Sequence, residues 1–372
     1  MSKTKEQLSN IQIFIIVIAS STAFGHFVYV HLSILYAGRD AWISLILAAL
    51  IGIGIVYIHL KFAISSDSGL YNHVHSVFGK WFGRLITSIY VMFFMIAVAV
   101  TIKVLSDFMD VIYPTTPPSV FLLAEFILIF WVVHSGVEVI GRTMQFLLPI
   151  LMVLGILASV LSTGDKDFTQ IFPIFERGMT PIFLGALPFI AMFSELVAFC
   201  CITQHARDPK KLPKQAWLLV TVLFFMFISP VTGPIMTFGE NMARNLAFPT
   251  YTEIQYIRVT NIIERMDIVG ISLWTIGSFF RISMFTFAIA KGLARLFDAK
   301  RQNAYLIPTV MLIAAISLSL MKASREEVYH FIGGIYLYLA LAVGVGIPLF
   351  TGIVALIRKK FGMKSRKLES AN

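Results

Sequence analysis

The apolar residues of this chain form long uninterrupted runs separated by short polar segments. They neither alternate with polar residues nor form a narrow stripe at a helical period. A helix needs about 20 apolar residues to cross the hydrocarbon core of a bilayer, so runs of this length predict membrane-spanning helices. Ten such runs occur, at residues 10–35, 40–62, 82–108, 118–134, 143–161, 181–204, 215–238, 268–297, 304–321 and 328–357.

The connections between the runs are short, which predicts one polytopic membrane domain over residues 1–372. The longest connections, roughly residues 63–81 and 239–267, cannot fold into an independent catalytic domain. The first run is expected to be a spanning helix rather than a cleaved signal peptide, because no small-residue cleavage site follows it. The expected fold class is an all-α integral membrane protein.

Composition supports the membrane assignment and excludes several other classes. Hydrophobic residues make up 58% of the chain and charged residues only 13%, against about a quarter in soluble domains. The adjacent Cys200 and Cys201 do not form a disulfide framework. No HExxH, GxSxG or Walker motif is present, and His73 and His75 have no nearby Cys or acidic ligand. We therefore expect neither an enzyme nor a metal site or other cofactor.

Lys and Arg fall unevenly on the connections, which predicts the orientation in the membrane. With a cytoplasmic N-terminus and alternating spans, cytoplasmic segments hold 20 of the 30 basic residues and external segments hold 8. Ten spans then leave both termini in the cytoplasm, including a basic tail at residues 358–372. The net charge of +10 thus marks orientation rather than a nucleic-acid-binding surface, because the basic residues lie in short segments between apolar runs.

Two spans are interrupted near their middle, at matching positions in the chain. The first contains the stretch 20–26, and the sixth contains Gly185 to Pro188 followed by residues 190–195. Each interrupted span opens a block of five, at residues 9–163 and 180–357. Backbone groups freed inside a membrane must bond to protein, water or a ligand, so paired interruptions predict a transporter-type binding site. The alternative is ordinary packing, since Gly and Pro are common in membrane helices.

Ionisable residues at membrane depth are rare and usually functional. Glu195 lies at the interruption of the sixth span, and Arg281 lies near the middle of the eighth. We expect these side chains to approach within salt-bridge range, directly or through one water, because pairing offsets the cost of burying each charge. The pair can form part of a binding site or only lock two helices together.

Three other ionisable residues are weaker candidates. His26 can titrate near neutrality, but a lone His beside small residues more often forms a packing hydrogen bond. Lys103 can pair with Asp107 four residues later or extend toward the membrane surface. Glu125 lies near the middle of the fourth span without irregular backbone around it.

One face of the third span combines an aromatic residue with small residues. Phe93, Ala97 and Thr101 recur at intervals of four and therefore lie on the same side of a helix. This face can line a cavity or serve ordinary packing of small residues between helices.

Several short motifs, in their order and spacing, point to a known family. They are Gly79-Lys80-Trp81-Phe82-Gly83, Phe193-Ser194-Glu195, and the stretch from Arg265 through Trp274 to Lys291-Gly292-Leu293. Over all ten spans the chain resembles the B subunits of bacterial endospore germinant receptors, spore germination permeases within the amino acid–polyamine–organocation transporter superfamily. The resemblance implies a leucine-transporter-like fold of two inverted five-helix repeats with interrupted first and sixth helices.

The resemblance also implies a location, partners and a ligand. The chain would lie in the spore inner membrane with a receptor A subunit and a C subunit, and it would bind a small germinant, an amino acid first among them. The ligand-binding residues that the resemblance implies are Gly25, Phe93, Ala97, Met192, Glu195, Phe280, Arg281 and Phe285. Thr22, His26 and Ser194, which lie in the interrupted stretches, complete the candidate set.

The resemblance is incomplete at one position, and this bears on mechanism. Proton-coupled relatives in the wider superfamily place a lysine in the fifth span, whereas residues 143–161 contain none. This difference favours a receptor over a proton-coupled transporter. Two alternatives remain open: an amino-acid symporter or permease of the same fold, and a scaffold or ion-conducting subunit with a closed pocket.

Overall fold

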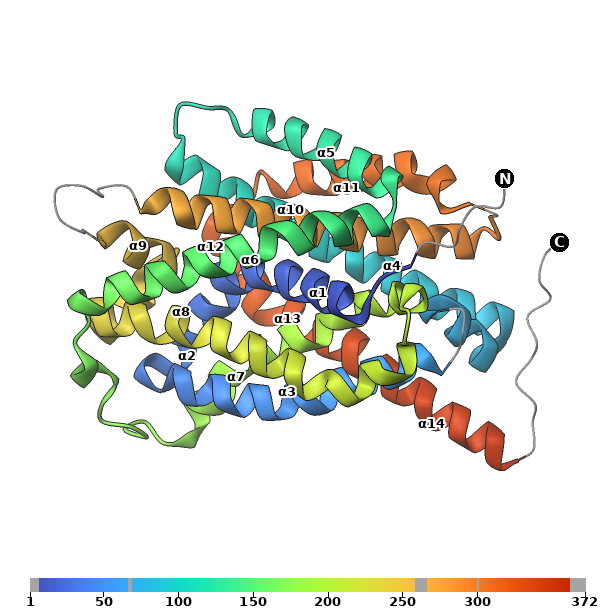
Figure 1. Ribbon diagram of the computed structural model, residues 1–372, viewed down its shortest axis with the longest axis horizontal. Coiled ribbons are helices and arrows are strands. Elements are labelled where there is room, and N and C mark those ends of the chain that lie inside the picture. The colour runs from blue at the N-terminus through green and yellow to red at the C-terminus, as the bar shows by residue number, and fades with distance from the viewer. Residues whose placement is uncertain (1–6, 66–68, 258–265, 300, 362–372) are drawn as a thin grey trace.

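The computed structural model describes residues 7–65, 69–257, 266–299 and 301–361, and almost all secondary structure in these residues is helical. Nine helical stretches in this part of the chain are long and apolar enough to cross a membrane. Figure 1 shows them running roughly parallel or antiparallel in one bundle. The α-helices are α1 (Asn10–Phe24), α2 (Val30–Ala37), α3 (Ala41–Ile64), α4 (Leu70–Ile112), α5 (Pro118–Ser135), α6 (Val137–Leu161), α7 (Met179–Glu195), α8 (Ala216–Asn245), α9 (Pro249–Tyr256), α10 (Asp267–Leu296), α11 (Leu306–Leu320), α12 (Arg325–Phe331), α13 (Leu337–Leu341) and α14 (Ile347–Lys360).

The longest helical stretch holds two of the expected spans. Residues Asn10–Ile64 form 55 residues of nearly continuous helix, about 80 Å if it were straight. The chain instead turns back at Gly38, whose φ of 59° is readily adopted only by a residue without Cβ. Figure 1 shows α1 and α2 leading to one end of the bundle and α3 returning from it.

A second glycine bends α4 near its start. Gly79 has φ 80° and ψ −171° within a helix that otherwise runs from Leu70 to Ile112. The short segment before Gly79 therefore turns away from the long one after it. The sequence places the start of this span at residue 82, which matches the segment after the bend.

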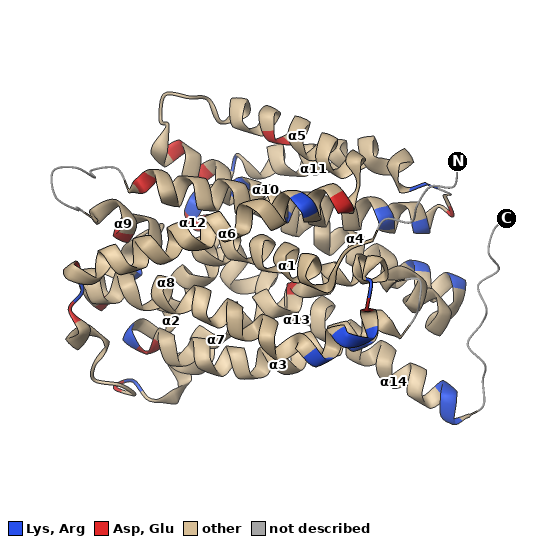
Figure 2. Ribbon diagram, viewed as in Figure 1, with Lys and Arg blue, Asp and Glu red and all other residues tan. Residues whose placement is uncertain are grey.

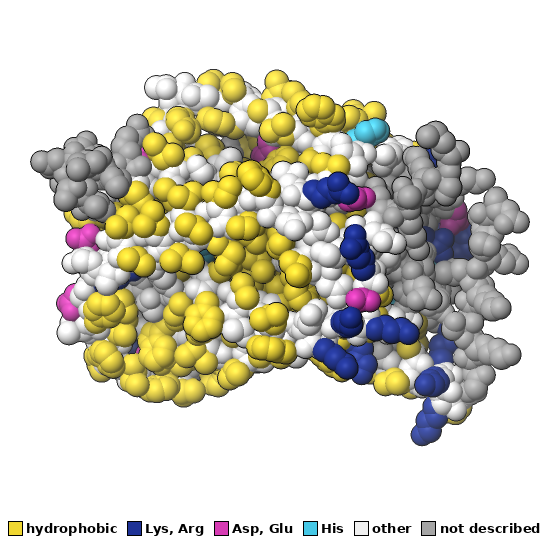
Figure 3. Space-filling model, viewed as in Figure 1, with side chains coloured by type: hydrophobic (Ala, Val, Ile, Leu, Met, Phe, Trp, Pro, Cys, Tyr) yellow, Lys and Arg dark blue, Asp and Glu magenta, His cyan; other side chains and the backbone are white. Residues whose placement is uncertain are grey.

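Buried and lipid-facing helices differ clearly in this bundle. Helix α10 packs along α4, and α3 packs along α7 and α8, so that α1, α4, α7 and α10 form much of the interior. Helices α5, α6 and α14 instead expose large apolar side chains, among them Trp131, Phe146 and Leu356. Figure 3 shows hydrophobic side chains over most of the visible face between the two ends. Such a surface suits lipid tails rather than water.

Charged residues gather at the two ends of the bundle, as Figure 2 shows. One end holds the start of α1 and the end of α14, and there Asp298 pairs with Arg84 at 2.8 Å and Arg295 at 3.4 Å. At the opposite end Glu240 is nearly buried and contacts three arginines, Arg39, Arg177 and Arg244. This separation agrees with a bundle that crosses a membrane along its helix axes.

The expected interruption of the first span is corrected by the structure. The helix continues through Gly25, which has φ −59° and ψ −45°, and widens into one π-helical turn over Gly25–Tyr29. The polar stretch does not unwind it because the hydroxyls of Ser21 and Thr22 donate to the carbonyls of Val17 and Ile18.

The sixth span is irregular next to Glu195, at the end of the stretch that the sequence indicates, rather than at Gly185 to Pro188. Helix α7 runs through Pro188 to Glu195, and the backbone then tightens into a 3₁₀ segment, Leu196–Cys201. The irregularity thus begins directly after Glu195, several residues later than Gly185 to Pro188. Both spans thus stay helical through the predicted stretches, and neither frees backbone N–H or C=O groups there for a ligand.

Candidate functional site

The expected contact between Glu195 and Arg281 is confirmed. An Nη2–H of Arg281 donates to Oε2 of Glu195 at 3.0 Å, and the two residues, Arg281 and Glu195, expose only 3% and 1% of their surface. Nε–H of Arg281 donates to the hydroxyl of Thr101, also at 3.0 Å. The contact is direct and joins the end of α7 to the middle of α10 and to α4.

Two tyrosines complete the surroundings of Glu195. The Tyr336 hydroxyl donates a short hydrogen bond to Oε1 of Glu195, and the Tyr29 hydroxyl is buried nearby without a hydrogen bond of its own. Both tyrosines are fully buried, and each is the last residue of a π-helical segment, Gly25–Tyr29 and Ile332–Tyr336. Wide helical turns are common at functional sites because they redirect side chains. Here they accompany two hydroxyls beside one buried carboxylate.

Aromatic rings surround the charged pair. The Arg281 guanidinium lies 4.4 Å from the ring centre of Phe24 and 4.7 Å from that of Phe285, distances typical of cation–π contacts. Phe93 stacks on Tyr336 at 5.9 Å. We call this group of side chains the central cluster, and its members are Phe24, Tyr29, Phe93, Thr101, Glu195, Arg281, Phe285 and Tyr336.

Of the other candidate residues, Ala97 lies one helical turn before Thr101, and Gly25 and Met192 contact each other near Phe227. Ala97 accepts a hydrogen bond from Thr101, whose hydroxyl also receives Nε–H of Arg281. Gly25 makes close contacts: a Cβ there would lie 2.3 Å from the Phe227 ring and 3.4 Å from the sulfur of Met192. Gly25 and Met192 are therefore within contact range of each other.

Two candidates are buried but lie off the charged pair. Phe280 precedes Arg281 by one residue and so points to another side of α10, where its ring contacts Phe279 at 5.0 Å. The Ser194 hydroxyl donates to the Ile190 carbonyl within its own helix. Ser194 packs against Gly344, where a Cβ would lie 2.1 Å from the Ser194 carbonyl oxygen.

Thr22 and His26 line a different cavity. It measures about 380 Å³ and lies between α1, α6, α8, α9 and α10. Nε1–H of Trp274 donates to Nδ1 of His26 at 3.1 Å, so the packing hydrogen bond considered for His26 is present. The cavity lies between α1 in the interior and the lipid-facing side chains of α6 and α8.

A larger cavity opens at the Glu240 end of the bundle, and we call it the vestibule. It measures about 830 Å³ and is lined by His31, Leu32, Leu35, Tyr36, Arg244, Asn245, Ala247, Arg325, Glu326, Tyr329, His330, Gly333 and Gly334. Leu32 lies three residues after Tyr29, and Gly333 lies three residues before Tyr336. The vestibule floor is therefore about one helical turn, roughly 5 Å along the helices, from the hydroxyls at Glu195.

Two tyrosine hydroxyls hold the helices around the vestibule together. The Tyr36 hydroxyl donates to the Gly333 carbonyl at 3.2 Å, and the Tyr329 hydroxyl donates to the Phe27 carbonyl at 3.1 Å. Both bonds join the first span to the last one. Tyr36, Tyr329 and Gly333, which take part in these bonds, line the vestibule.

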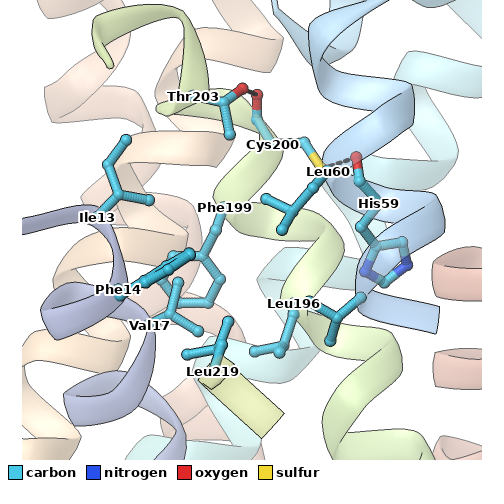
Figure 4. A pocket seen from close by; sticks show the side chains of 11 residues that line it. Ile13, Phe14, Val17, His59, Leu60, Leu196, Phe199, Cys200, Thr203 and Leu219 are labelled. Carbon is cyan, nitrogen blue, oxygen red and sulfur yellow. Dashed lines mark hydrogen bonds between the residues drawn. The ribbon is translucent and has the colours of Figure 1, made fainter. Parts of the chain in front are cut away.

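A third cavity, of about 20 Å³, is shown in Figure 4. Phe14, Val17, Leu196, Phe199 and Leu219 surround it, and the Cys200 thiol beside it donates to the His59 carbonyl at 3.4 Å. Its volume matches about one water molecule. It is therefore a packing defect at the 3₁₀ segment rather than a site for an organic ligand.

The two weaker ionisable candidates on α4 and α5 differ in their surroundings. Lys103 pairs with Asp107 at 2.6 Å, which confirms the expected contact. Glu125 lies on the peripheral helix α5, and one of its carboxylate oxygens is buried without a hydrogen bond. Within residues 7–65, 69–257, 266–299 and 301–361, no three His, Cys, Asp or Glu side chains are grouped as metal ligands.

Sequence reasoning missed Phe24, Tyr29 and Tyr336. The signal available for Tyr336 is a hydroxyl that follows Gly333-Gly334 inside an apolar run, and for Tyr29 it is proximity to Gly25. Thr101 was identified only as part of a helix face. Its role as a partner of Arg281 depends on how α4 meets α10.

Comparisons with known proteins agree with this description. The family described as "Spore germination protein" matches residues 7–327. Spore germination protein XB of Bacillus anthracis is 27% identical over 343 residues, which cover 91% of this chain and 94% of that protein. Spore germination protein KB of Bacillus subtilis (strain 168) is 25% identical over 343 residues, with coverage of 90% and 91%.

Solved structures support the fold. MhsT in complex with L-phenylalanine superposes with a TM-score of 0.70 at 15% identity, covering 99% of this chain and 94% of that one. A Na⁺-coupled sialic acid symporter in a substrate-bound outward-open state gives 0.65 at 11% identity, with coverage of 96% and 85%. At these identities the likeness concerns the fold, and the expected leucine-transporter-like class is confirmed at that level.

Proposed function

The chain belongs to the spore germination protein family, and from this premise we propose that it is the membrane subunit of a nutrient-germinant receptor. It would bind a small germinant, an amino acid first among the candidates, at the central cluster. It would transmit binding to receptor A and C subunits in the spore inner membrane.

The proposal includes the finer architecture. Counting α1–α2 and α3 as separate crossings gives ten spans, arranged as two inverted repeats over residues 9–163 and 180–357. The excess of Lys and Arg on alternate connections supports cytoplasmic termini. The vestibule would then open to the outer side of the membrane.

The observation that carries the ligand assignment is the buried Glu195–Arg281 pair. A free amino acid has a carboxylate that matches Arg281 and an ammonium group that matches Glu195. Separating a buried ion pair without replacement costs about 3–5 kcal/mol, but a zwitterion inserted between the partners restores both contacts. Phe24, Phe93 and Phe285 supply apolar surface for the ligand side chain.

Access would come from the vestibule. Arg244 and Arg325 are the basic residues on its wall, and they favour entry of molecules that carry a carboxylate. The hydroxyl bonds of Tyr36 and Tyr329 must break before a ligand reaches Glu195, because they tie the first span to the last. The described conformation would therefore be closed at the vestibule floor.

The mechanism would be a population shift. A germinant that binds better when Glu195 and Arg281 are separated favours the arrangement of helices in which they are apart. The partner subunits would respond to that arrangement. The π-helical turns at Gly25–Tyr29 and Ile332–Tyr336 are the segments best placed to rearrange, because they carry Tyr336, which bonds to Glu195, and the buried Tyr29 hydroxyl near it.

The test is germinant binding and spore response in charge variants. Purified protein in nanodiscs is titrated with a panel of L-amino acids by calorimetry, and spores carrying Glu195→Gln or Arg281→Lys are tested with the amino acid that binds. Both variants should lose binding and response while the protein remains in the membrane. Asp107→Asn is the matched control, since it breaks a Lys–Asp pair elsewhere on α4. Normal binding in both charge variants would refute the site.

A transporter of the same fold is the second candidate, because the two structural neighbours include a Na⁺-coupled symporter. Uptake of radiolabelled amino acid into proteoliposomes separates the two functions. Concentrative uptake driven by an ion gradient would favour transport, whereas binding without uptake would favour the receptor.

A further inference from the structure

We propose that the 380 Å³ cavity between α6 and α8, here called the lateral pocket, binds a single hydrocarbon chain from the bilayer. Its floor is α1 at Thr22 and His26, and α9 and α10 close its sides with Ile254 and Trp274. The site is distinct from the central cluster and does not depend on the proposed germinant function.

The mouth of the lateral pocket opens toward lipid. Ile156 and Val160 on α6 and Phe225 on α8 line the pocket and are 61%, 62% and 67% exposed on the outside of the bundle. The contact between α6 and α8 above it includes a bond between the Ser159 and Ser229 hydroxyls at 2.6 Å. A molecule dissolved in the membrane can thus enter sideways between these helices.

The polar groups around the pocket already have partners within the protein. Thr22 donates to the Ile18 carbonyl. Thr250 donates to the Pro230 carbonyl at 3.3 Å. This carbonyl has no helical partner because residue 234 is proline, which has no N–H to donate. Glu253 pairs with Lys166 at 3.0 Å. The exception is His26, which lines the pocket and whose Nε2 is buried near the Met226 backbone without a hydrogen bond.

These contacts decide what the pocket can hold. Ordered water needs two to four polar partners, whereas most of the lining is apolar and the hydroxyls and the carboxylate on the wall already bond within the protein. An empty space of this size would leave the apolar wall without dispersion contacts on one side. A hydrocarbon chain makes these dispersion contacts with the apolar wall and requires no hydrogen bond. It can come from a membrane phospholipid or from a free amphiphile such as a fatty acid.

Gly155 offers a way to block the pocket. Nothing lies closer than 3.9 Å to a Cβ placed there, and the first atom met is Leu273 Cδ1 across the pocket. Gly155→Leu therefore fills the space with little local strain. Gly54→Leu on α3 is the matched control, because it also adds a side chain to a helical glycine with open space around it.

The experiment uses the full chain in nanodiscs with two photoreactive probes, a diazirine-bearing palmitic acid and a phosphatidylglycerol with a diazirine acyl chain. Crosslinked peptides are mapped by mass spectrometry. Saturable labelling of α6 and α8 residues that line the pocket is expected with at least one probe, competed by unlabelled palmitate, lost in Gly155→Leu and retained in Gly54→Leu. Labelling by the phospholipid identifies a membrane lipid as the source, and labelling by palmitic acid alone identifies a free amphiphile.

Two results would overturn the proposal. One is labelling spread evenly over the lipid-facing helices without saturation, which denotes bulk lipid contact. The other is saturable labelling unchanged by Gly155→Leu, which places the chain elsewhere. Competition by palmitate in the unmodified protein tests the site even if Gly155→Leu fails to fold.

Discussion

Removing Arg281 should destabilise the protein more than removing both members of its ion pair. In Arg281→Met the Glu195 carboxylate stays 1% exposed and keeps the Tyr336 hydrogen bond, but it loses its countercharge. Loss of one partner of a buried pair costs about 3–5 kcal/mol, whereas replacing both by neutral groups of similar volume is often close to neutral. The double variant Glu195→Gln/Arg281→Met should therefore recover most of the lost stability.

The assay is a double-mutant cycle. Unfolding of both single variants, the double variant and the parent is followed by tryptophan fluorescence in mixed micelles with increasing SDS. We expect a coupling energy of about 3 kcal/mol, well above the roughly 0.5 kcal/mol seen for independent sites. Additive effects, or an Arg281→Met variant as stable as the parent, would refute the assignment of a desolvated ion pair.

The same cycle separates stability from function. If germinant binding uses both charges, the stable double variant should respond to no germinant, although it folds. A double variant that still responds would show that the pair only locks α7 to α10.

Three more predictions concern single positions. Gly25→Val should cost about 1–3 kcal/mol and abolish the germinant response, because its Cβ would overlap the Phe227 ring; thermal unfolding and spore germination assays measure the two effects. Tyr336→Phe should lower stability by about 1.5–3 kcal/mol in the same unfolding assay by removing a hydrogen bond to a buried carboxylate, whereas Tyr338→Phe, at an exposed position, should not. Burial raises the pKa of Glu253 above 4.5, so the folded state binds the carboxyl proton more tightly than the unfolded state does. The free energy of unfolding should therefore fall as the pH rises from 4.5 through the raised pKa. Thermal unfolding at a series of pH values measures this effect, and Glu253→Gln should lack it.

The charged centre was predictable because charges are scarce in this chain. An ionised side chain in hydrocarbon must find a partner, and Glu195 and Arg281 are polar exceptions in two apolar runs. That argument needs no knowledge of how the helices pack. The scarcity of charges therefore predicts the contact between Glu195 and Arg281 but not the residues around it.

The surroundings were not predictable for the opposite reason. Tyrosines are numerous, and a hydroxyl in an apolar run carries little information until the helices that meet it are known. Tyr29 and Tyr336 reach Glu195 only through packing between helices far apart in sequence. Phe280 and Ser194 lie off the charged pair because neighbouring positions on a helix point in different directions.

The two interruptions were expected in the right spans but with the wrong geometry. Ser and Thr side chains beside Gly25 were treated as signs of unwinding. In the structure their hydroxyls bond to carbonyls one turn earlier, and the helix accommodates the irregularity as a wide turn. Pro188 is absorbed within α7, and the backbone changes only after Glu195.

The wide turns have a consequence for insertions and deletions. A π-turn closes its hydrogen bond over one residue more than an α-turn, so it stores a single extra residue within an otherwise regular helix. Deleting one residue from Gly25–Tyr29 would let the turn close as α-helix and keep α2 facing α7 and α8. The same deletion in α3 would rotate everything beyond it by about 100°. The segments beside Glu195 are thus where these spans can change length by one residue without turning their buried faces toward lipid.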